Sequence, residues 1–173
     1  SGLVMARPYV KDRFMTFLNP AADPLNSGYQ IQQSLIAVGS GGFFGRGFGQ
    51  SLQKFNFLPE PIGDSIFAVA AEEFGFIGGI IIIGLFCALC WRGLKIASNT
   101  SKSFGGLVVV GLVILISTQA FINIGAMLGV IPLSGLPLLF ISHGGTALFF
   151  TLVSAGILFL SLIHISEPTR RSY

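Results

Sequence analysis

Three ionisable side chains, Lys54, Glu60 and Asp64, lie within the short stretch QKFNFLPEPIGD, residues 53–64, directly before a long apolar segment. The prolines on either side of Glu60 restrict the backbone, so the direction of this side chain relative to Asp64 should be well defined. A carboxylate at the mouth of an apolar helix could accept a proton from a hydroxyl group, or bind a divalent cation such as magnesium or manganese. Asp64 would equally suit the N-cap of that helix, and the two interpretations are compatible.

A glycine-rich stretch, GSGGFFGRGFG over residues 39–49, precedes these residues. Glycines allow positive φ and close approach of the backbone to a ligand, and Arg46 together with Lys54 could place positive charge beside a phosphate. The stretch is not a P-loop, because it lacks the GxxxxGKS or GxxxxGKT pattern between a strand and a helix. The alternative is that the glycines serve tight turns of a loop packed on the membrane face. The candidate substrate-binding residues are polar side chains in and around these stretches: Gln53, Lys54, Arg46, Glu60, Glu73 and His143.

Two adjacent acids, Glu72 and Glu73, lie about two turns into the apolar segment that follows Asp64. Ionised groups at that depth are costly in lipid, so one of them should face a polar cavity inside the protein. Neighbouring side chains on a helix point roughly 100° apart, so both acids cannot easily face one partner. If the helix begins later, both acids would be in water instead. Farther along, Gln119 and Asn123 share a helix face, which favours interhelical packing.

The composition indicates that lipid is the solvent for most of these elements. Hydrophobic residues make up 52% of the 173 residues and charged residues only 10%, which does not suit a water-facing surface. No Asp, Glu, Lys or Arg occurs between Ser103 and Ser166, a run long enough to cross a bilayer more than once. Hydropathy predicts three spans, each helical because backbone polar groups in lipid must be satisfied within the segment: residues 65–91, 104–124 and 144–162. We therefore predict an all-α polytopic membrane protein, with a three-helix transmembrane region over 65–162 after a long loop over 1–64.

Charge on the short connections predicts the orientation of the chain in the membrane. The connection 92–103 carries three basic residues and no acid, whereas the connection 129–143 carries no charge. The positive-inside rule places the first in the cytoplasm and the second outside, so residues 1–64 should be extracytoplasmic. Within that loop, residues 29–38 predict a short helix at the membrane interface or in a protein groove. His143 favours a structural hydrogen bond to a neighbouring loop over proton transfer.

Net charge and the two ends of the chain indicate which partners are excluded and which residues belong to the natural sequence. The formal net charge of +3 is small and the basic residues are scattered, which argues against nucleic acid and favours membrane lipid as a partner. The first residues lack a signal peptide and resemble the cut end of a longer chain. Residues 160–170, LSLIHISEPTR, resemble a translated sequencing adaptor. We predict that 160–173 is a non-native tail and exclude it from functional reasoning.

Ordered motifs run through most of the chain. They read DPxxSGYQxxQSLIAxGSGGxxGxGxGxSxQKxxxLPE at 23–60, DxIFAVxxEExGFxG at 64–78 and IPLSGLPLLFISHGGTAL at 131–148. Together they resemble the SEDS family (FtsW/RodA/SpoVE type) over nearly the whole chain up to about Phe159. The resemblance implies a ten-helix glycosyltransferase of the bacterial inner membrane that polymerises lipid II beside a class B penicillin-binding protein. This chain would supply the large extracytoplasmic loop and the last three helices.

Residue by residue, the essential acid of the family falls on Asp64. Family members often read HTD where this chain has IGD at 62–64, and SYGGS where it has SHGGT at 142–146, so the acid is retained while its two preceding residues differ. The implied reaction is attack by an acceptor sugar hydroxyl on a donor whose leaving group is a polyprenyl diphosphate, with inversion. Asp64 would be the general base or hold a divalent cation. Lys54, Arg46 or that cation would offset the diphosphate charge.

Two other functions stay open on the sequence alone. The same fold could transport a lipid-linked sugar across the bilayer, with Glu72 or Glu73 as the coupling site. A scaffold role in division or elongation is the third interpretation. These motifs do not separate the division, elongation and sporulation branches. Because the helices that precede this chain in the family are missing from it, we expect the fragment alone to be inactive.

Overall fold

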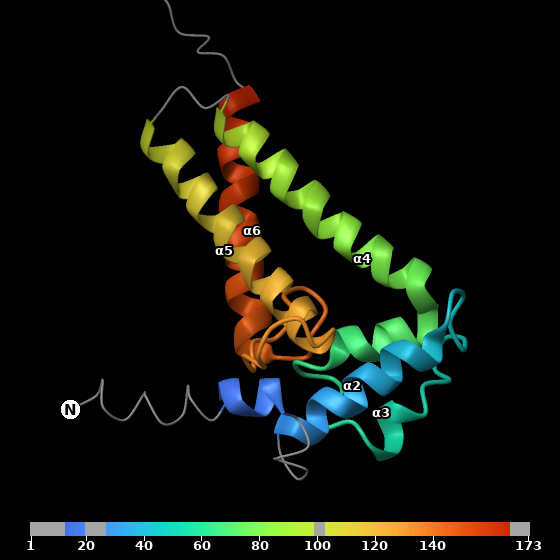
Figure 1. The fold of residues 1–173 in the computed structure, drawn as a ribbon. Helices are drawn as coiled ribbons and strands as arrows, with labels where there is room; N and C mark the ends of the chain where they lie inside the picture. Colours follow the sequence, from blue (N-terminus) through green and yellow to red (C-terminus); the bar gives the residue numbers. More distant parts are fainter. Residues whose placement is uncertain (1–12, 20–26, 99–102, 167–173) are drawn as a thin grey trace, which may run out of the picture.

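The computed structural model describes residues 13–19, 27–98 and 103–166, and all regular secondary structure within them is helical (Figure 1). The elements are a short helix over 13–18, α2 (Ser27–Gly41), α3 (Gln53–Asn56), α4 (Ile66–Ser98), α5 (Ser103–Met127) and α6 (Gly145–Ser166). The all-α fold class predicted from the sequence is confirmed. Residues 1–12 and 20–26 of the predicted loop, and 167–173 of the predicted tail, lie outside the described residues.

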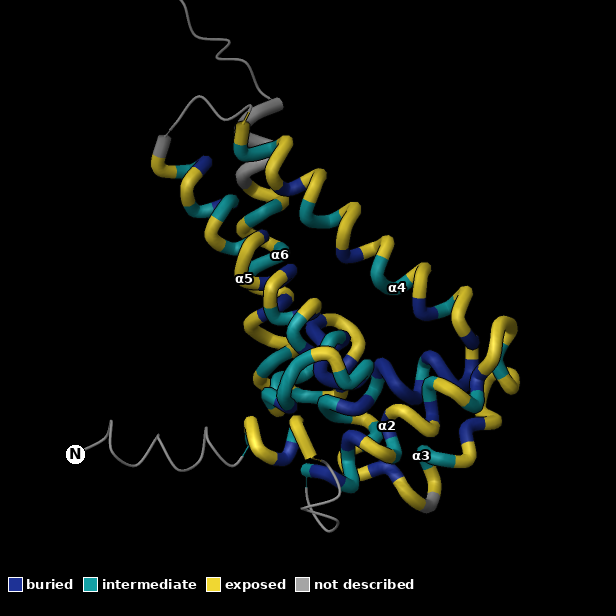
Figure 2. The backbone as a smooth tube through the Cα atoms, in the orientation of Figure 1, coloured by how far each residue is buried: buried dark blue, intermediate teal, exposed yellow. Residues whose placement is uncertain are grey.

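Two helices in the described part of the chain are long and apolar enough to cross a membrane, Ile66–Ser98 and Phe104–Met127. The apolar part of α6, Gly145–Leu160, is shorter. The three helices occupy the ranges in which spans were predicted, and α4 runs on to Ser98. Large apolar side chains are exposed along all three helices. Figure 2 marks many exposed positions along them. Such faces suit contact with lipid or with further helices.

The seam between α4 and α5 is the main helix–helix contact. Five small or branched side chains of α5 are fully or almost fully buried at spacings of three or four residues: Val109, Val113, Ile116, Ala120 and Ile124. That spacing puts them on one helical face. Gly93 of α4 lies against this face, where an added Cβ would be 2.2 Å from Cγ2 of Val113. A glycine at this position therefore lets the two backbones approach closely.

Helix α2 buries one face against the first part of α4. Its buried residues recur at helical spacing: Gly28, Ile31, Ser34, Ala37 and Gly41. A Cβ on Gly41 would lie 2.1 Å from the carbonyl oxygen of Ala71, so the two backbones touch at this point. The helix predicted over 29–38 is therefore longer at both ends, and one of its faces packs against α4.

Helix α4 is broken at Gly75, which has φ 69° and ψ −163°. The part over 66–74 lies beside α2, and the longer part over 76–98 leads away from it at an angle (Figure 1). Only glycine adopts such a backbone conformation readily. The predicted span over 65–91 did not include this break. Glu72 and Glu73 therefore precede the break and do not belong to the long membrane-crossing part.

The glycine-rich segment forms hydrogen bonds with the backbone groups that the break in α4 leaves without helical partners. In a continuous helix the amides of Phe76 and Ile77 would donate to the carbonyls of Glu72 and Glu73. Here they donate to the carbonyls of residues 42 and 43 at 2.8 and 3.3 Å. The carbonyls of Glu72 and Glu73 accept the amides of residues 46 and 47, both at 3.0 Å. Residues 42–47 thus satisfy four backbone groups that the break exposes, as non-helical backbone at membrane depth requires.

The connections divide between the two ends of the molecule. Helices α2 and α3, the first part of α4 and the connection 128–144 lie together at one end, and the ends of α4 and α5 next to residues 99–102 lie at the other (Figure 1). Buried residues are concentrated at the first end (Figure 2). The candidate polar residues are also at this end.

Candidate functional site

Asp64 lies at the entrance to α4 but outside its first turn. The helix begins at Ile66, and the carbonyl of Ser65 accepts the amides of Ala68 and Val69 at 3.0 and 3.3 Å. Ser65 therefore occupies the N-cap position, one residue after Asp64, and its hydroxyl donates to the carbonyl of Pro59 at 3.0 Å. The carboxylate of Asp64 is half-buried.

Asn123 of α5 holds the backbone of Asp64 in place. Its side chain is 1% exposed, and its Nδ2 atom donates to the carbonyl of Asp64 at 2.8 Å and to that of Leu136 at 2.6 Å. One buried amide thus joins the Asp64 turn to the connection 129–143. Gln119, one turn earlier, donates to the carbonyl of Pro137 at 3.3 Å. Both polar residues of α5 bind this connection, whereas helix–helix contact was predicted for them.

The same connection fixes the two residues before Asp64. The Ser142 hydroxyl donates to the carbonyl of Gly63 at 2.6 Å and accepts the amide of Leu138 at 2.8 Å. The backbone amide of His143 donates to the carbonyl of Ile62 at 2.9 Å. The predicted hydrogen bond from His143 to a neighbouring loop is therefore made by its backbone, while the residue itself is exposed. The backbone of 62–64 is tied to the connection at successive residues.

Arg13, which the sequence analysis did not select, reaches the same connection. One guanidinium nitrogen, Nη1, donates to the carbonyl of Leu133. The other, Nη2, lies 3.9 Å from the position that a Cβ on Gly135 would take, and Oδ2 of Asp64 lies 3.8 Å from that position. A lone arginine 51 positions before Asp64 carries no motif that would predict this proximity. Only the fold brings the two charges together.

Glu72 forms a second cluster at the break in α4. Its carboxylate is fully buried and accepts the Ser51 hydroxyl at 2.5 Å and the Leu52 amide at 3.1 Å. The Gln53 amide donates at 3.4 Å, and Nη1 of Arg46 lies 3.7 Å away. Glu72 therefore caps the start of α3 and fastens it to α4. It contacts protein in the described residues, and the cavity predicted for one of the two acids stays a prediction.

Glu73 is buried beside it and pairs with Lys54. The distance from Nζ of Lys54 to Oε1 of Glu73 is 4.0 Å, and this oxygen accepts no hydrogen bond in the described part of the protein. Oε1 of Gln53 is buried in the same way. Two of the predicted substrate-binding cations, Arg46 and Lys54, are thus each paired with a buried glutamate.

The structure therefore divides the predicted site residues into two groups. Glu60 and His143 belong with Asp64, since the carbonyl of Glu60 accepts the amides of Gly63 and Ser65 within the same turn. The other group gathers around Glu72 and Glu73. Eight residues of mostly helical chain separate Asp64 from Glu72, a rise of about 12 Å at 1.5 Å per residue. Arg46 and Lys54 lie with the second group.

The comparisons with known proteins agree with these motifs. A family model for FtsW, RodA and SpoVE, described as cell cycle protein, matches residues 2–167. The chain belongs to the FtsW/RodA/SpoVE family. The resemblance stated from the sequence is confirmed.

Named relatives of this FtsW/RodA/SpoVE chain are curated proteins of more than twice its length. Stage V sporulation protein E of Bacillus subtilis (strain 168) is 51% identical over 169 residues, which are 98% of this chain and 45% of that protein. A probable peptidoglycan glycosyltransferase FtsW of Halothiobacillus neapolitanus is 44% identical over 94% of this chain and 39% of its own length. One of Geobacter metallireducens is 45% identical over 90% of this chain and 42% of its own. The chain therefore spans less than half the length of these relatives.

A solved structure of a peptidoglycan synthase complex, described as coordinating polymerization and crosslinking, contains a similar chain. The TM-score is 0.71 at 28% identity, over 93% of this chain and 44% of that one. The helical arrangement described above is thus shared with a member of such a complex.

A divalent cation in this FtsW/RodA/SpoVE chain would have few protein ligands. No group of three or more His, Cys, Asp or Glu side chains comes together among the described residues. Magnesium commonly binds through one or two carboxylates together with substrate phosphates and water, so Asp64 could supply one protein ligand. The residues fit a cation that arrives with a phosphorylated substrate, and they do not form a complete cage.

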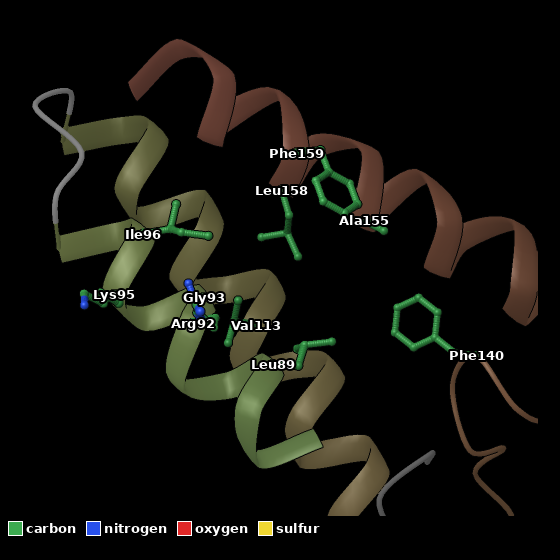
Figure 3. A pocket seen from close by; sticks show the side chains of 10 residues that line it. All are labelled: Leu89, Arg92, Gly93, Lys95, Ile96, Val113, Phe140, Ala155, Leu158 and Phe159. Carbon is green, nitrogen blue, oxygen red and sulfur yellow. The ribbon is translucent and has the colours of Figure 1, made fainter. Parts of the chain in front are cut away.

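A cavity lies elsewhere in this FtsW/RodA/SpoVE chain, between α4, α5 and α6 (Figure 3). Its volume is about 720 Å³, and side chains such as Leu89, Leu158 and Phe159 line it. Arg92 and Lys95 are its charged lining residues, and none of the described lining residues is an acid. The cavity cannot supply a general base. It is separate from the Asp64 site.

Proposed function

We propose that the full-length protein carrying this chain is a peptidoglycan glycosyltransferase that polymerises lipid II, with Asp64 as its catalytic carboxylate. The observation that carries the proposal is the fixed backbone of 62–64 in a chain of this family. Asn123, Ser142 and the amide of His143 hold three successive carbonyls. A catalytic carboxylate needs such support, because small displacements of a catalytic group are costly in rate.

The proposed reaction is a single displacement at the anomeric carbon of the donor sugar. The acceptor hydroxyl oxygen forms the new bond to that carbon, and the bond from the carbon to the diphosphate oxygen breaks. The electron pair leaves with the polyprenyl diphosphate, and Asp64 takes the hydroxyl proton. Attack opposite to the leaving group inverts the configuration. A divalent cation bound by Asp64 and the diphosphate would supply charge neutralisation to the leaving group.

The proposal extends to the partner and to the membrane face of the site. The complex that contains the similar chain couples polymerization with crosslinking. We propose accordingly that a class B penicillin-binding protein is the partner of the full-length protein. Membrane lipid surrounds the long helices. The end that carries Asp64 faces outward, because the opposite end bears the basic connection 92–103.

Transport of a lipid-linked sugar has less support at this site. A coupling acid must change its protonation or its partners during the cycle. The Glu72 carboxylate accepts a hydroxyl and two backbone amides and pairs with Arg46, so it has a structural role in fastening α3. Polymerisation is therefore the function that these contacts support best.

The test is glycan chain formation from lipid II by the purified full-length protein with Asp64→Asn. Asparagine keeps the shape of the side chain but is a much weaker proton acceptor and metal ligand, so we expect polymerisation to fall by about 10²- to 10⁴-fold. Protein abundance and partner association should stay near normal. Glu60→Gln, the same chemical change at the exposed acid four residues away, shows whether the effect is specific to Asp64 or shared by both acids of this turn. Polymerisation by Asp64→Asn at close to the unmodified rate would remove the catalytic assignment.

A further inference from the structure

Two basic side chains of the last turns of α4, Arg92 and Lys95, line the cavity between α4, α5 and α6. We propose that this cavity binds an anionic phospholipid, with an acyl chain between the helices and the phosphate at the two basic side chains. On the proposed orientation the lipid belongs to the cytoplasmic leaflet. The site is separate from Asp64, and the inference goes beyond the proposed polymerisation.

The interior of the cavity is apolar. Apart from the two cations, every described lining residue is apolar or glycine, and the lining comes from all three helices and from Phe140 of the connection 128–144 (Figure 3). The volume of about 720 Å³ lies within the range of about 300–1,000 Å³ that is usual for small-molecule sites. Such a lining offers no side-chain hydrogen bond to a polar ligand and suits a hydrocarbon chain.

Close packing of α4 on α5 forms one wall of the cavity. A Cβ on Gly93 would lie 2.2 Å from Cγ2 of Val113, and both residues line the cavity. The side chains of Leu158 and Phe159 of α6 lie across from this wall (Figure 3). The space is therefore enclosed by three helices and is more than one exposed helix face.

The charge of the lining has one sign. Arg92 and Lys95 are both exposed, and no acid is among the described lining residues. Figure 3 shows the Lys95 ammonium directed away from the apolar side chains, so this charge lies at the mouth of the cavity. Long basic side chains at the end of a membrane helix commonly place their charge at the level of the lipid headgroups. The mouth is therefore complementary to an anion.

The cavity distinguishes these two cations from ordinary basic residues of a membrane protein. Basic residues at this end of α4 also follow from the positive-inside rule, and by themselves they would mark no site. That both of them line an apolar cavity between helices is a second, independent observation. Basic pockets between membrane helices on the cytoplasmic side are a known way of binding anionic lipid headgroups.

An anionic phospholipid satisfies both parts of the site. Its acyl chain fills the apolar interior, and its phosphate oxygens accept hydrogen bonds from the guanidinium fork of Arg92 and the ammonium of Lys95. An apolar helix from the preceding part of the protein would fill the interior but leave both cations without a negative partner. A zwitterionic lipid brings its own cation beside the phosphate. The charge of the mouth therefore favours the anionic lipid over both alternatives.

The test measures binding of dioleoyl phosphatidylglycerol to the purified full-length protein in detergent, by native mass spectrometry during a lipid titration. Loss of one basic residue beside the phosphate predicts that Arg92→Gln or Lys95→Gln raises the Kd about fivefold, and that the double variant raises it about 25-fold. Dioleoyl phosphatidylcholine has the same acyl chains without the net charge. It should bind more weakly, and with the same Kd in all of these variants.

A matched pair of substitutions on α6 tests the apolar part of the site. Ala155 lines the cavity, whereas Val153, two residues earlier, is exposed and is not among the described lining residues. Ala155→Phe should fill the space of the acyl chain, and displacing only two of its methylene groups would raise the Kd about tenfold. Val153→Phe adds the same ring outside the cavity and should leave the Kd unchanged.

An unchanged Kd for phosphatidylglycerol in the double variant would overturn the proposal, and so would equal Kd values for Ala155→Phe and Val153→Phe. If Ala155→Phe lowered the unfolding midpoint or changed subunit association while the Kd stayed the same, a helix of the protein or a second copy would occupy the cavity, and the proposal would be wrong. If Ala155→Phe does not fold, the double variant decides, because Arg92 and Lys95 are exposed. Polymerisation is not measured, so failure of the Asp64 assignment would leave this result unaffected.

Discussion

Replacement of Gly45 by alanine tests the contact between the glycine-rich segment and the break in α4. Gly45 has φ +80°, and an added Cβ would lie 2.1 Å from the carbonyl oxygen of Glu73. Gly49 is the matched control, because it has φ +76° and no atom within 4 Å of its Cβ position. Both substitutions impose the same left-handed backbone strain, and only one of them collides with α4.

The difference between the two variants can be estimated from the bonds that the collision opens. Left-handed strain costs about 1–2 kcal/mol for an L-residue and is common to both. To relieve the collision, residues 45–47 must move away from α4 and give up the amide bonds from Arg46 and Gly47 to the carbonyls of Glu72 and Glu73. Each such bond is worth about 1 kcal/mol net. We expect Gly45→Ala to be about 2 kcal/mol less stable than Gly49→Ala.

Thermal unfolding of the purified full-length variants in one detergent provides the measurement. A difference of this size should lower the unfolding midpoint of Gly45→Ala by a further few degrees relative to Gly49→Ala. Equal midpoints for the two variants would refute the reasoning. They would mean that the loop is not in contact with α4 at this point, and that its glycines serve only the turns.

Further predictions concern the support of Asp64 and the orientation of the chain. Asn123→Leu removes the donor of two carbonyls, those of Asp64 and Leu136. Polymerisation should therefore fall by about 10- to 100-fold through displacement of Asp64. Gln119→Leu removes one longer bond and should have little effect on polymerisation. Similar polymerisation rates for both variants would show that Asn123 does not position Asp64. In a cysteine-free background, Ser98→Cys should resist a membrane-impermeant maleimide added to intact cells, because α4 ends beside the basic connection. Labelling from outside would reverse the proposed orientation.

The helices were predictable because hydropathy depends only on local composition. The uncharged run between Ser103 and Ser166 required helices in lipid, and the structure has α5 and α6 within that run. The break at Gly75 was not predictable in the same way. Glycine is frequent in membrane helices, so one more glycine carries no signal. The break depends on residues 42–47, which replace its hydrogen bonds from about thirty positions away in the sequence.

The candidate site was also predictable only where the sequence pattern is local. Asp64 could be selected because proline-stiffened backbone and an acid before an apolar segment form a local pattern. The assignment of Arg46 and Lys54 to phosphate rested on their charge in and near a glycine-rich stretch, and it stays a prediction. The structure adds that these two side chains pair with Glu72 and Glu73. Pairing of this kind is decided by tertiary packing. Arg13 was not predicted to lie near Asp64, because its contact with the Gly135 turn leaves no pattern in the local sequence.

Residues 66–74 connect the two clusters, with Asp64 at one end of this short helix and the glycine-rich segment at the other. At the start of this short helix, Asn123 and the connection 129–143 fix the Asp64 turn. At its end, residues 42–47 and the start of α3 fix Glu72 and Glu73. A helix held at both ends cannot slide or rotate without breaking buried hydrogen bonds at one of them. The position of the Asp64 carboxylate therefore depends on contacts about 12 Å away, at 1.5 Å of rise per residue. Disruption of the glycine-rich contact should thus reduce polymerisation as well as stability.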